Sequence, residues 1–333
     1  MNIGQLVGER MRVEEPTIVQ SMGMMPLIAM NHVNEISPLL LLDEALEKGF
    51  AHITEAGEEG HVPFLLLRNK GTMPILILDG EELVGGKQNR VVNTTILAPP
   101  GCELTIPVAC MEQGRWHLKS AAFGSGEAIF RARSRAQQKA GVTETLQRHC
   151  SFSGNQHMVW DEVRCSLAQT DAASPTADFR EARRSVSDRI EAYVNSVKPL
   201  AEQIGAVFYS PRGVIGCELL ATADLFARAF AKIIRSFAFE VLEQPAMAED
   251  GAEAPRIWLQ KVMSAPVVTR PSPGAGEDLR IASRDVIGSG LIWHNQLLHL
   301  SCFPQNQPAS DTGHENRSTR QTASARKKRM QTS

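Results

Sequence analysis

Residues 75–116 read ILILDGEELVGGKQNRVVNTTILAPPGCELTIPVACMEQGRW, and this stretch decides the fold that we expect. Three of its segments are apolar and rich in residues that favour β-strands, with turn-forming residues between them: Ile75–Leu78, Val91–Leu97 and Leu104–Ala109. The connection Ala98-Pro-Pro-Gly101 is short, so the second and third strands should be antiparallel neighbours. The longer connection before the second strand also allows the chain to return beside the first strand. The stretch therefore predicts an antiparallel meander.

Polar residues crowd the rim of this meander where the first strand ends, the second begins and the third ends. Carboxylates beside arginines and amides suit a polyhydroxylated or phosphorylated small molecule, because an arginine binds an anion through its planar fork and amides bond to hydroxyl or carbonyl groups. Glu81 and Glu112 are the candidates for a catalytic carboxylate. The candidate ligand-binding residues are Asp79, Glu82, Gln88, Asn89, Arg90, Asn93, Arg115 and Trp116.

Two other interpretations of this rim stay open. The same residues could form a buried polar network that fixes the register of the strands, or their carboxylates could bind Mg²⁺ or Ca²⁺. We assign no residue as a metal ligand and name no cofactor. Gly85-Gly86 could bring backbone amides close to a phosphate, although a turn that needs positive φ is the more ordinary explanation.

Two motifs outside the meander also have a functional and a structural interpretation. A stripe of basic residues at four-residue spacing predicts a solvated helix face in preference to a phosphate contact: Arg131, Arg135 and Lys139. The glycine-rich segment 273–280, PGAGEDLR, is either a flexible connector or a loop that brings three charged residues to the rim: Glu277, Asp278 and Arg280.

The histidines and cysteines do not define a site by their spacing. His294 and His299 lie five residues apart in a predicted strand region, so they should face opposite sides and not share a metal. His157 and Asp161 could touch on one helix face. The six cysteines are scattered without a C-x-x-C pair, which predicts reduced and mostly buried thiols.

Composition and charge restrict the class of protein. The 333 residues are 43% apolar and carry a net charge of −2, as expected of a globular protein. No apolar segment has the length of a membrane span, and the N-terminus lacks the apolar core of a signal peptide, so we expect a cytoplasmic protein. Residues 305–333 are polar and basic, and the remainder is mildly acidic, which excludes a dedicated duplex-binding protein that recognises specific nucleic acid.

The order of the predicted elements indicates one α+β domain over residues 1–304. Strands dominate residues 10–116, a helical section covers 127–263, and terminal strands follow in 265–303. We expect an antiparallel sheet built from the N-terminal meander and the C-terminal strands, with the helical section packed on it. The expected helices are Asp43–Lys48, Ala128–Ala140, Gln156–Leu167, Asp178–Val197, Thr222–Leu242 and Arg256–Met263.

The string DGEELVGGKQNRVVNTT at 79–95, followed by IPVACMEQGRW at 106–116, resembles the prokaryotic ARG and Rhodanese-Phosphatase-superfamily-associated Protein domain. The resemblance extends from about residue 10 to Phe303 and includes VWDEV at 159–163 and HLSCFP at 299–304. The name of the family refers to its genomic association with ADP-ribosylglycohydrolases and rhodanese-like phosphatases. The resemblance thus implies ADP-ribose or an NAD-derived metabolite as ligand, by analogy, and it assigns no role to any single residue.

The sequence leads to two hypotheses about function. The first is a cytoplasmic protein that binds a nucleotide-like or ADP-ribose-like ligand at the rim and hydrolyses it, with Glu81 or Glu112 as general base and Arg90 or Arg115 on the anion. The second is a non-catalytic regulatory or sensor module that acts with a partner enzyme.

We predict that the C-terminal tail, 305–333, is disordered, because it lacks the large apolar residues needed to bury surface. Ending the chain after Pro304 should therefore leave the melting temperature unchanged within about a degree, as measured by differential scanning calorimetry. A larger fall in the melting temperature would show that the tail packs on the domain.

Overall fold

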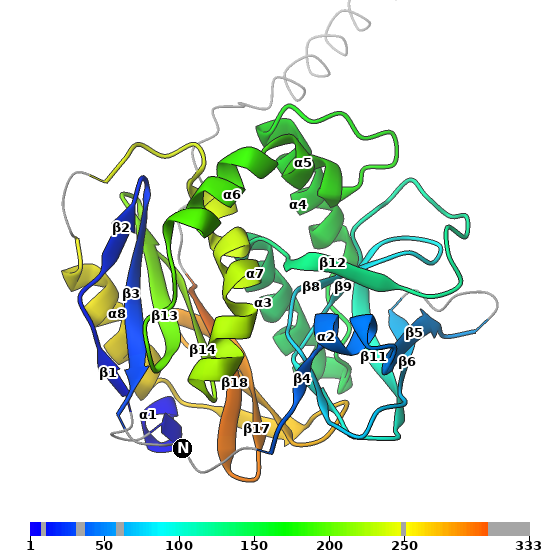
Figure 1. Cartoon of the computed structure of the whole chain (residues 1–333), viewed down its shortest axis with the longest axis horizontal. Helices are drawn as coiled ribbons and strands as arrows, with labels where there is room; N and C mark the ends of the chain where they lie inside the picture. Colours follow the sequence, from blue (N-terminus) through cyan, green and yellow to red (C-terminus); the bar gives the residue numbers. More distant parts are fainter. Residues whose placement is uncertain (8–10, 31–36, 58–62, 248–250, 306–333) are drawn as a thin grey trace, which may run out of the picture.

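The computed structural model describes residues 1–7, 11–30, 37–57, 63–247 and 251–305. It confirms the α+β class, with helices packed between and around three sheets (Figure 1). The predicted tail lies outside the described residues, apart from Gln305. No helix among the residues described is long and apolar enough to cross a membrane.

The largest sheet has nine strands and joins three separate parts of the chain. Its order is β1-β3-β13-β14-β18-β17-β16-β15, with β2 also paired to β3, and every pairing is antiparallel. The N-terminal and C-terminal strands thus share a sheet, as expected, but only the first three strands of the chain take part. The bounds are β1 Met11–Val13, β2 Thr17–Val19, β3 Met22–Ala29, β13 Gln203–Ser210, β14 Gly213–Leu220, β15 Val268–Pro271, β16 Glu277–Ala282, β17 Val286–Trp293 and β18 Gln296–Pro304.

The strands of residues 40–129 form two smaller sheets. The six-stranded sheet has the order β12-β8-β9-β11-β6-β5. A single β-bridge between Ile53 of β5 and Phe123, the residue before β12, brings the two edges of this sheet together. The three-stranded sheet has the order β10-β7-β4. The bounds are β4 Leu40–Leu41, β5 Ala51–Glu55, β6 Phe64–Asn69, β7 Ile75–Ile77, β8 Glu81–Val84, β9 Arg90–Val92, β10 Ile96–Ala98, β11 Glu103–Cys110 and β12 Gly124–Ile129.

The predicted antiparallel neighbours are present, but they lie in two sheets and not in one meander. The apolar run 91–97 divides into β9, which pairs with β11, and β10, which pairs with β7 in another sheet. Between them the side chains of Thr94 and Thr95 bond to groups in distant strands, and this polar interruption turns the chain out of the first sheet. The short connection 98–101 consequently links two strands that are not paired with each other.

The helices occupy the predicted regions with two corrections. The helix α3 begins at Ala132, four residues later than predicted, and continues through Gly141 to His149. Gly141 does not end the helix, and it packs closely against the backbone of Asn155. The predicted helix 178–197 is divided at Val186, which has non-helical backbone angles. The bounds are α1 Ile3–Val7, α2 Leu42–Glu47, α3 Ala132–His149, α4 Gln156–Gln169, α5 Phe179–Ser185, α6 Ser187–Ser196, α7 Ala223–Val241 and α8 Glu253–Ser264.

The predicted amphipathic helix α7 lies in the centre of the molecule, beside α3 (Figure 1). It buries its apolar stripe against one face of the large sheet, where the Phe237 ring stacks on Phe208 at 3.9 Å between centroids. The other face of that sheet is covered by α1 and α8, which form a second apolar cluster. The two faces of the large sheet are therefore both buried, and polar groups on the inner face must find partners in the protein.

We expect Phe237→Ala to lower the free energy of unfolding by about 3–5 kcal/mol, because Phe237 is fully buried and its loss leaves a cavity at the sheet–helix contact. Urea denaturation followed by circular dichroism measures this change. Leu200→Ala is the control, since Leu200 is 47% exposed and its replacement should change stability by no more than about 0.5 kcal/mol. Equal effects of the two substitutions would contradict the assignment of the core.

Candidate functional site

The ten predicted site residues do not lie on one open rim. Nine of them are buried, and they belong to several separate polar networks whose partners come from other parts of the chain. Trp116 is the exception, with 54% of its surface exposed. Two of these networks have the composition of a functional site and are described first: the Asp79 network and the β8–β9 clasp.

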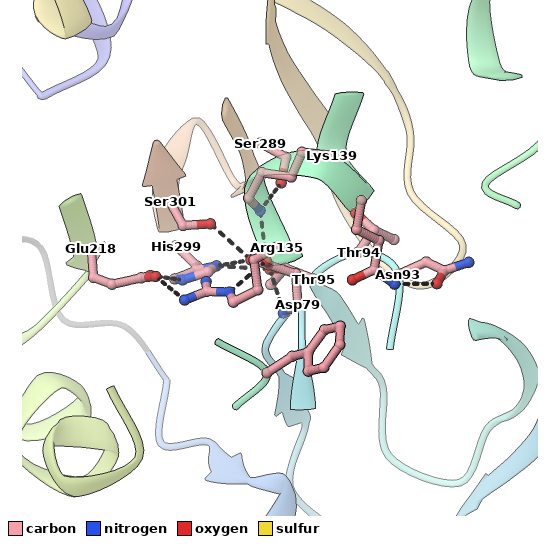
Figure 2. Close-up of polar contacts among 12 residues, drawn as sticks. Asp79, Asn93, Thr94, Thr95, Arg135, Lys139, Glu218, Ser289, His299 and Ser301 are labelled. Carbon is pink, nitrogen blue, oxygen red and sulfur yellow. Dashed lines mark hydrogen bonds and ion pairs between the residues drawn. The ribbon is translucent and has the colours of Figure 1, made fainter. Parts of the chain in front are cut away.

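The Asp79 network joins the end of β7 to α3 and to the large sheet (Figure 2). One carboxylate oxygen of Asp79 accepts hydrogen bonds from Arg135 Nε at 3.2 Å and pairs with Lys139 Nζ at 2.6 Å. The other oxygen accepts a hydrogen bond from Ser301 Oγ at 2.9 Å. Lys139 also donates to Ser289 Oγ at 2.6 Å, so the helix α3 is bonded both to the end of β7 and to β17.

A second carboxylate completes this network from the middle of β14. Arg135 NH1 lies 2.5 Å from Glu218 Oε1, and His299 Nε2 lies 2.8 Å from Glu218 Oε2. The other ring nitrogen of His299 is 2.7 Å from Thr95 Oγ1, in the loop between β9 and β10. The five ionisable members are all at most 3% exposed in their side chains: Asp79, Arg135, Lys139, Glu218 and His299.

The electrostatics of the Asp79 network follow from its burial. Burial alone would raise the pKa of Asp79, but Arg135, Lys139 and His299 outweigh it and hold that pKa well below the ordinary value of 3.8. Burial lowers the pKa of Lys139, and Arg135 adds to this effect while Asp79 opposes it. The pKa of Arg135 is raised by Asp79 and Glu218, which overcome its burial. Two carboxylates therefore face two cations without contact with water.

The basic stripe on α3 was predicted to be solvated, and this prediction is wrong. Arg135 and Lys139 are the two cations of the Asp79 network, and Arg131 forms a buried pair with Glu240 of α7, with 2.6 Å between Arg131 NH2 and Glu240 Oε2. All three face inward because their carboxylate partners come from other elements, which the spacing within the helix does not reveal.

The glycine-rich segment 273–280 reaches the region of the Asp79 network, as one of its two interpretations required. Asp278 and Arg280 form a buried pair on β16, and Thr94 Oγ1 donates to Asp278 Oδ1 at 2.7 Å. The neighbouring Asn93 accepts a hydrogen bond from Gln138 Nε2 at 2.6 Å. Glu277, in contrast, is exposed.

The β8–β9 clasp is the second network, and we define it by five residues: Gln88, Asn89, Glu112, Arg115 and Asp178. Arg115 donates to the backbone carbonyls of Gly85 and Gly86, to Asn89 Oδ1 and to Glu112 Oε2. Asn89 Nδ2 donates to Asp178 Oδ2 at 2.9 Å, and its backbone N–H donates to Glu112 Oε2 at 3.2 Å. Asn89 therefore connects the arginine and both carboxylates.

Gly85-Gly86 forms a turn that needs positive φ, which is the structural one of its two explanations. Both glycines have positive φ, and a Cβ on either would lie within 2.4 Å of a neighbouring side-chain atom. Their amides donate to Asn89 Oδ1 and Ser120 Oγ instead of pointing toward an open phosphate site. The glycines thus allow the close approach that the clasp needs.

Glu112 and Asp178 face each other across a β-bridge, and their pKa values move in opposite directions. Burial raises the pKa of Asp178 to about 6, and the neighbouring Glu112 and Glu82 add to this rise. Burial would also raise the pKa of Glu112, but hydrogen bonds from Arg115, Asn89 and Thr176 lower it. A pair of carboxyl groups with separated pKa values is the arrangement used for acid–base chemistry.

Asp178 was missed in the sequence because it has an ordinary explanation there. It begins a predicted helix, and in the structure it is the N-cap of α5, where it accepts a hydrogen bond from the backbone N–H of Arg180. Nothing in its spacing indicates that it faces Glu112. The sequence likewise did not indicate the partners of Glu218 and His299, because both lie in otherwise apolar strands. His299 is buried, whereas His294 is exposed in the turn before β18.

The remaining predicted residues have partners of their own. Glu81 Oε1 accepts a hydrogen bond from Lys232 Nζ at 2.8 Å, and burial raises the pKa of Glu81 to about 7 although Lys232 opposes this. Glu82 forms an ion pair with Arg183 of α5. Arg90 is fully buried, in contact with Cys110 and 3.6 Å from Glu55. Within the described ranges, no group of three or more His, Cys, Asp or Glu side chains is arranged to hold a metal ion.

We expect Asp79→Asn to lower the free energy of unfolding by about 3–5 kcal/mol at pH 7, because it leaves Arg135 and Lys139 buried without their shared carboxylate. The pKa of Asp79 is depressed in the folded state, so its stabilisation is present above the unfolded pKa near 3.8 and is lost as the pH falls through the folded value. The difference between wild type and variant, measured by urea denaturation, should thus shrink below about pH 4.

The matched control is Asp161→Asn, which removes a carboxylate from an exposed pair with Arg164. Its effect should stay below about 1 kcal/mol at every pH, since exposed pairs are screened by water. An Asp79→Asn variant as stable as this control would show that the Asp79 network does not hold the fold together.

The comparisons with known proteins add one result. Neither the curated proteins nor the solved structures gave a match. The family described as the ARG and Rhodanese-Phosphatase-superfamily-associated Protein domain matches residues 10–303, which include the meander strings, the Asp79 network and the β8–β9 clasp. Because that match covers most of the chain, the protein belongs to the ARG and Rhodanese-Phosphatase-superfamily-associated Protein domain family.

Proposed function

We propose that this protein is a cytoplasmic binding protein for a nucleotide-like or ADP-ribose-like ligand, and that the β8–β9 clasp recognises the ribose hydroxyls of that ligand. The proposal rests on the chemistry of the clasp and on the analogy that the family name offers. The proposal assigns only the hydroxyl-bearing part of the ligand to the clasp.

The observation that carries the proposal is a surplus of hydrogen-bond acceptors around Asp178. Glu82 Oε2 and Gln88 Oε1 are buried, and neither receives a hydrogen bond from any residue that the structure describes. Glu82 lies near enough to Asp178 to raise its pKa, and Gln88 is anchored by its amide nitrogen to the backbone of Glu112. A buried acceptor without a donor costs about 1–3 kcal/mol, and ribose hydroxyls would supply such donors.

The backbone of β12 packs closely against Glu82. A Cβ at Gly126 would lie 2.6 Å from Glu82 Cβ and 3.0 Å from Glu82 Oε2. A larger residue at this position would displace the Glu82 side chain, so glycine lets the buried carboxylate lie against β12.

The arginines do not support the anion-binding role that we expected of them. Arg115 directs its N–H groups at Glu112, Asn89 and backbone carbonyls, and Arg90 is buried beside Glu55. An anion at either guanidinium would have to replace protein acceptors already in place. We therefore assign the hydroxyl groups to the clasp and leave the phosphates of the ligand to side chains outside it.

A non-catalytic sensor that acts with a partner enzyme is the second candidate, and one feature of the clasp favours it. Both carboxylate oxygens of Glu112 are occupied by protein donors, because Oε1 accepts from Thr176 and Oε2 accepts from Arg115 and Asn89. These donors lower the pKa of Glu112, which makes it a weaker general base. Asp178, with a pKa of about 6, retains the acid–base capacity of a hydrolase. Product formation from bound ligand separates the hydrolase from the sensor.

We expect ADP-ribose at millimolar concentration to raise the melting temperature, with inorganic phosphate giving a much smaller shift. A ligand at a hundredfold excess over Kd stabilises the folded state by about 2.7 kcal/mol. Asp178 accepts a hydroxyl donor best when it is ionised, so the shift should grow as the pH rises through about 6. Thermal shift assays with and without magnesium measure these effects.

The variants Asp178→Asn and Glu82→Gln should reduce the shift with ADP-ribose, whereas the surface variant Asp161→Asn should retain it. Calorimetric titration of the folded variants separates loss of affinity from loss of fold. Absence of any shift with ADP-ribose, NAD or mononucleotides in wild-type protein would end the nucleotide-like proposal.

A further inference from the structure

Two cysteines face each other in the middle of the large sheet. Cys217 on β14 and Cys302 on β18 are direct partners in the antiparallel register, and both are buried. Burial raises the pKa of Cys302, and the neighbouring Cys217 adds to this rise. Directly opposed residues of antiparallel strands have Cα atoms about 4.5–5.5 Å apart, and this is within the range of about 4.4–6.8 Å that disulfides span.

The backbone on β17 leaves room for one of these sulfur atoms. A Cβ at Gly288 would lie 2.6 Å from Cys302 Sγ, so a larger residue at this position would displace the thiol. Gly288 is the partner of Cys302 in the β17–β18 register. Glycine at this position thus lets the Cys302 side chain lie on this face of the sheet.

The pair lies directly behind the Asp79 network. The next residues in register are Glu218 and Ser301, which point to the opposite face of the sheet and bond to Arg135 and Asp79. The strands β14 and β18 are central in the order of the sheet, so a covalent bond between them would fasten the part of the sheet that carries both network residues.

We propose that Cys217 and Cys302 form a reversible disulfide when the protein is exposed to a peroxide, and that this bond locks β14 to β18. One thiolate attacks a peroxide oxygen, the O–O bond breaks, and a sulfenic acid and water are formed. The second thiol then attacks the sulfenyl sulfur, an S–S bond forms and a second water leaves. The two sulfurs lose one electron each, and hydrogen peroxide is reduced to two molecules of water.

Burial makes this reaction slow. It raises the pKa of Cys302 well above its ordinary value, so little thiolate is present while the sheet is closed. The reaction therefore requires transient opening of β14 from β18, and the exposed thiols of Cys150 and Cys165 react first. The disulfide therefore forms during prolonged exposure to peroxide and not during a brief exposure.

The test uses full-length protein in which the more accessible cysteines are replaced by serine: Cys102, Cys150 and Cys165. After prolonged incubation with hydrogen peroxide, the protein is denatured, alkylated and digested. We expect a cross-linked peptide containing Cys217 and Cys302, lighter than the two free peptides by two hydrogen atoms and separated by dithiothreitol. The oxidised protein should also unfold more slowly in urea than its reduced form.

The matched variant Cys217→Ser in the same background should give no such peptide and should leave Cys302 open to alkylation. Because the mapping of the parent protein needs no substitution in the pair, a folding defect in Cys217→Ser does not weaken the test. Recovery of both cysteines as alkylated thiols in the parent, after incubation that fully oxidises Cys150 and Cys165 of wild-type protein, would overturn the proposal. Sulfinic acid on either cysteine without the cross-link would overturn it as well.

Discussion

The carboxylate of Asp79 is buried where three sheets and a helix meet, and its charge must be compensated inside the protein. Arg135 and Lys139 of α3 supply that compensation, and Ser301 of β18 completes the hydrogen bonds of the carboxylate. These bonds join α3 and β18 to the end of β7. The Asp79 network therefore fixes how the small sheets of residues 40–129 sit against the large sheet (Figure 2).

The β8–β9 clasp has a different physical character, although it lies only a few residues away in the sequence. The Asp79 network balances two cations against two carboxylates, and each carboxylate has an ion-pair partner within the network. In the clasp, Arg115 bonds to protein acceptors, and two buried acceptors lack donors among the residues described: Gln88 Oε1 in the clasp and Glu82 Oε2 beside it. The Asp79 network is explained by its contribution to stability. The region of the clasp lacks hydrogen-bond donors for these two acceptors within the described part of the chain, and for this reason we assign ligand recognition to the clasp.

The sequence predicted the elements much better than their partners. Local periodicity was enough for α7, because this helix carries its own apolar pattern. It could not show that the run 91–97 divides, since Thr94 and Thr95 bond to Asp278 and His299, in strands that lie 184 and 204 residues further along the chain. The α+β class followed from the order of elements, and the division into three sheets did not.

The residues of the candidate site were also predicted better than their partners. The polar string 79–95 and its continuation to Arg115 were correctly identified as unusual, yet their residues divide among several networks because neighbours in sequence point to different faces. Arg135 and Lys139 looked like a solvated stripe, and only the three-dimensional arrangement gives them a carboxylate. Asp178 had a sufficient explanation as a helix cap, so no signal in the sequence could have placed it opposite Glu112.

A double-mutant cycle between Asp79 and Lys139 tests the central claim most directly. Asp79→Asn, Lys139→Met and the double variant would be compared with wild type by urea denaturation at pH 7. If the buried pair, at 2.6 Å, holds the sheets together, the two losses should be strongly non-additive, with a coupling free energy of about 1–3 kcal/mol. Losses that simply add, within about 0.5 kcal/mol, would contradict the account.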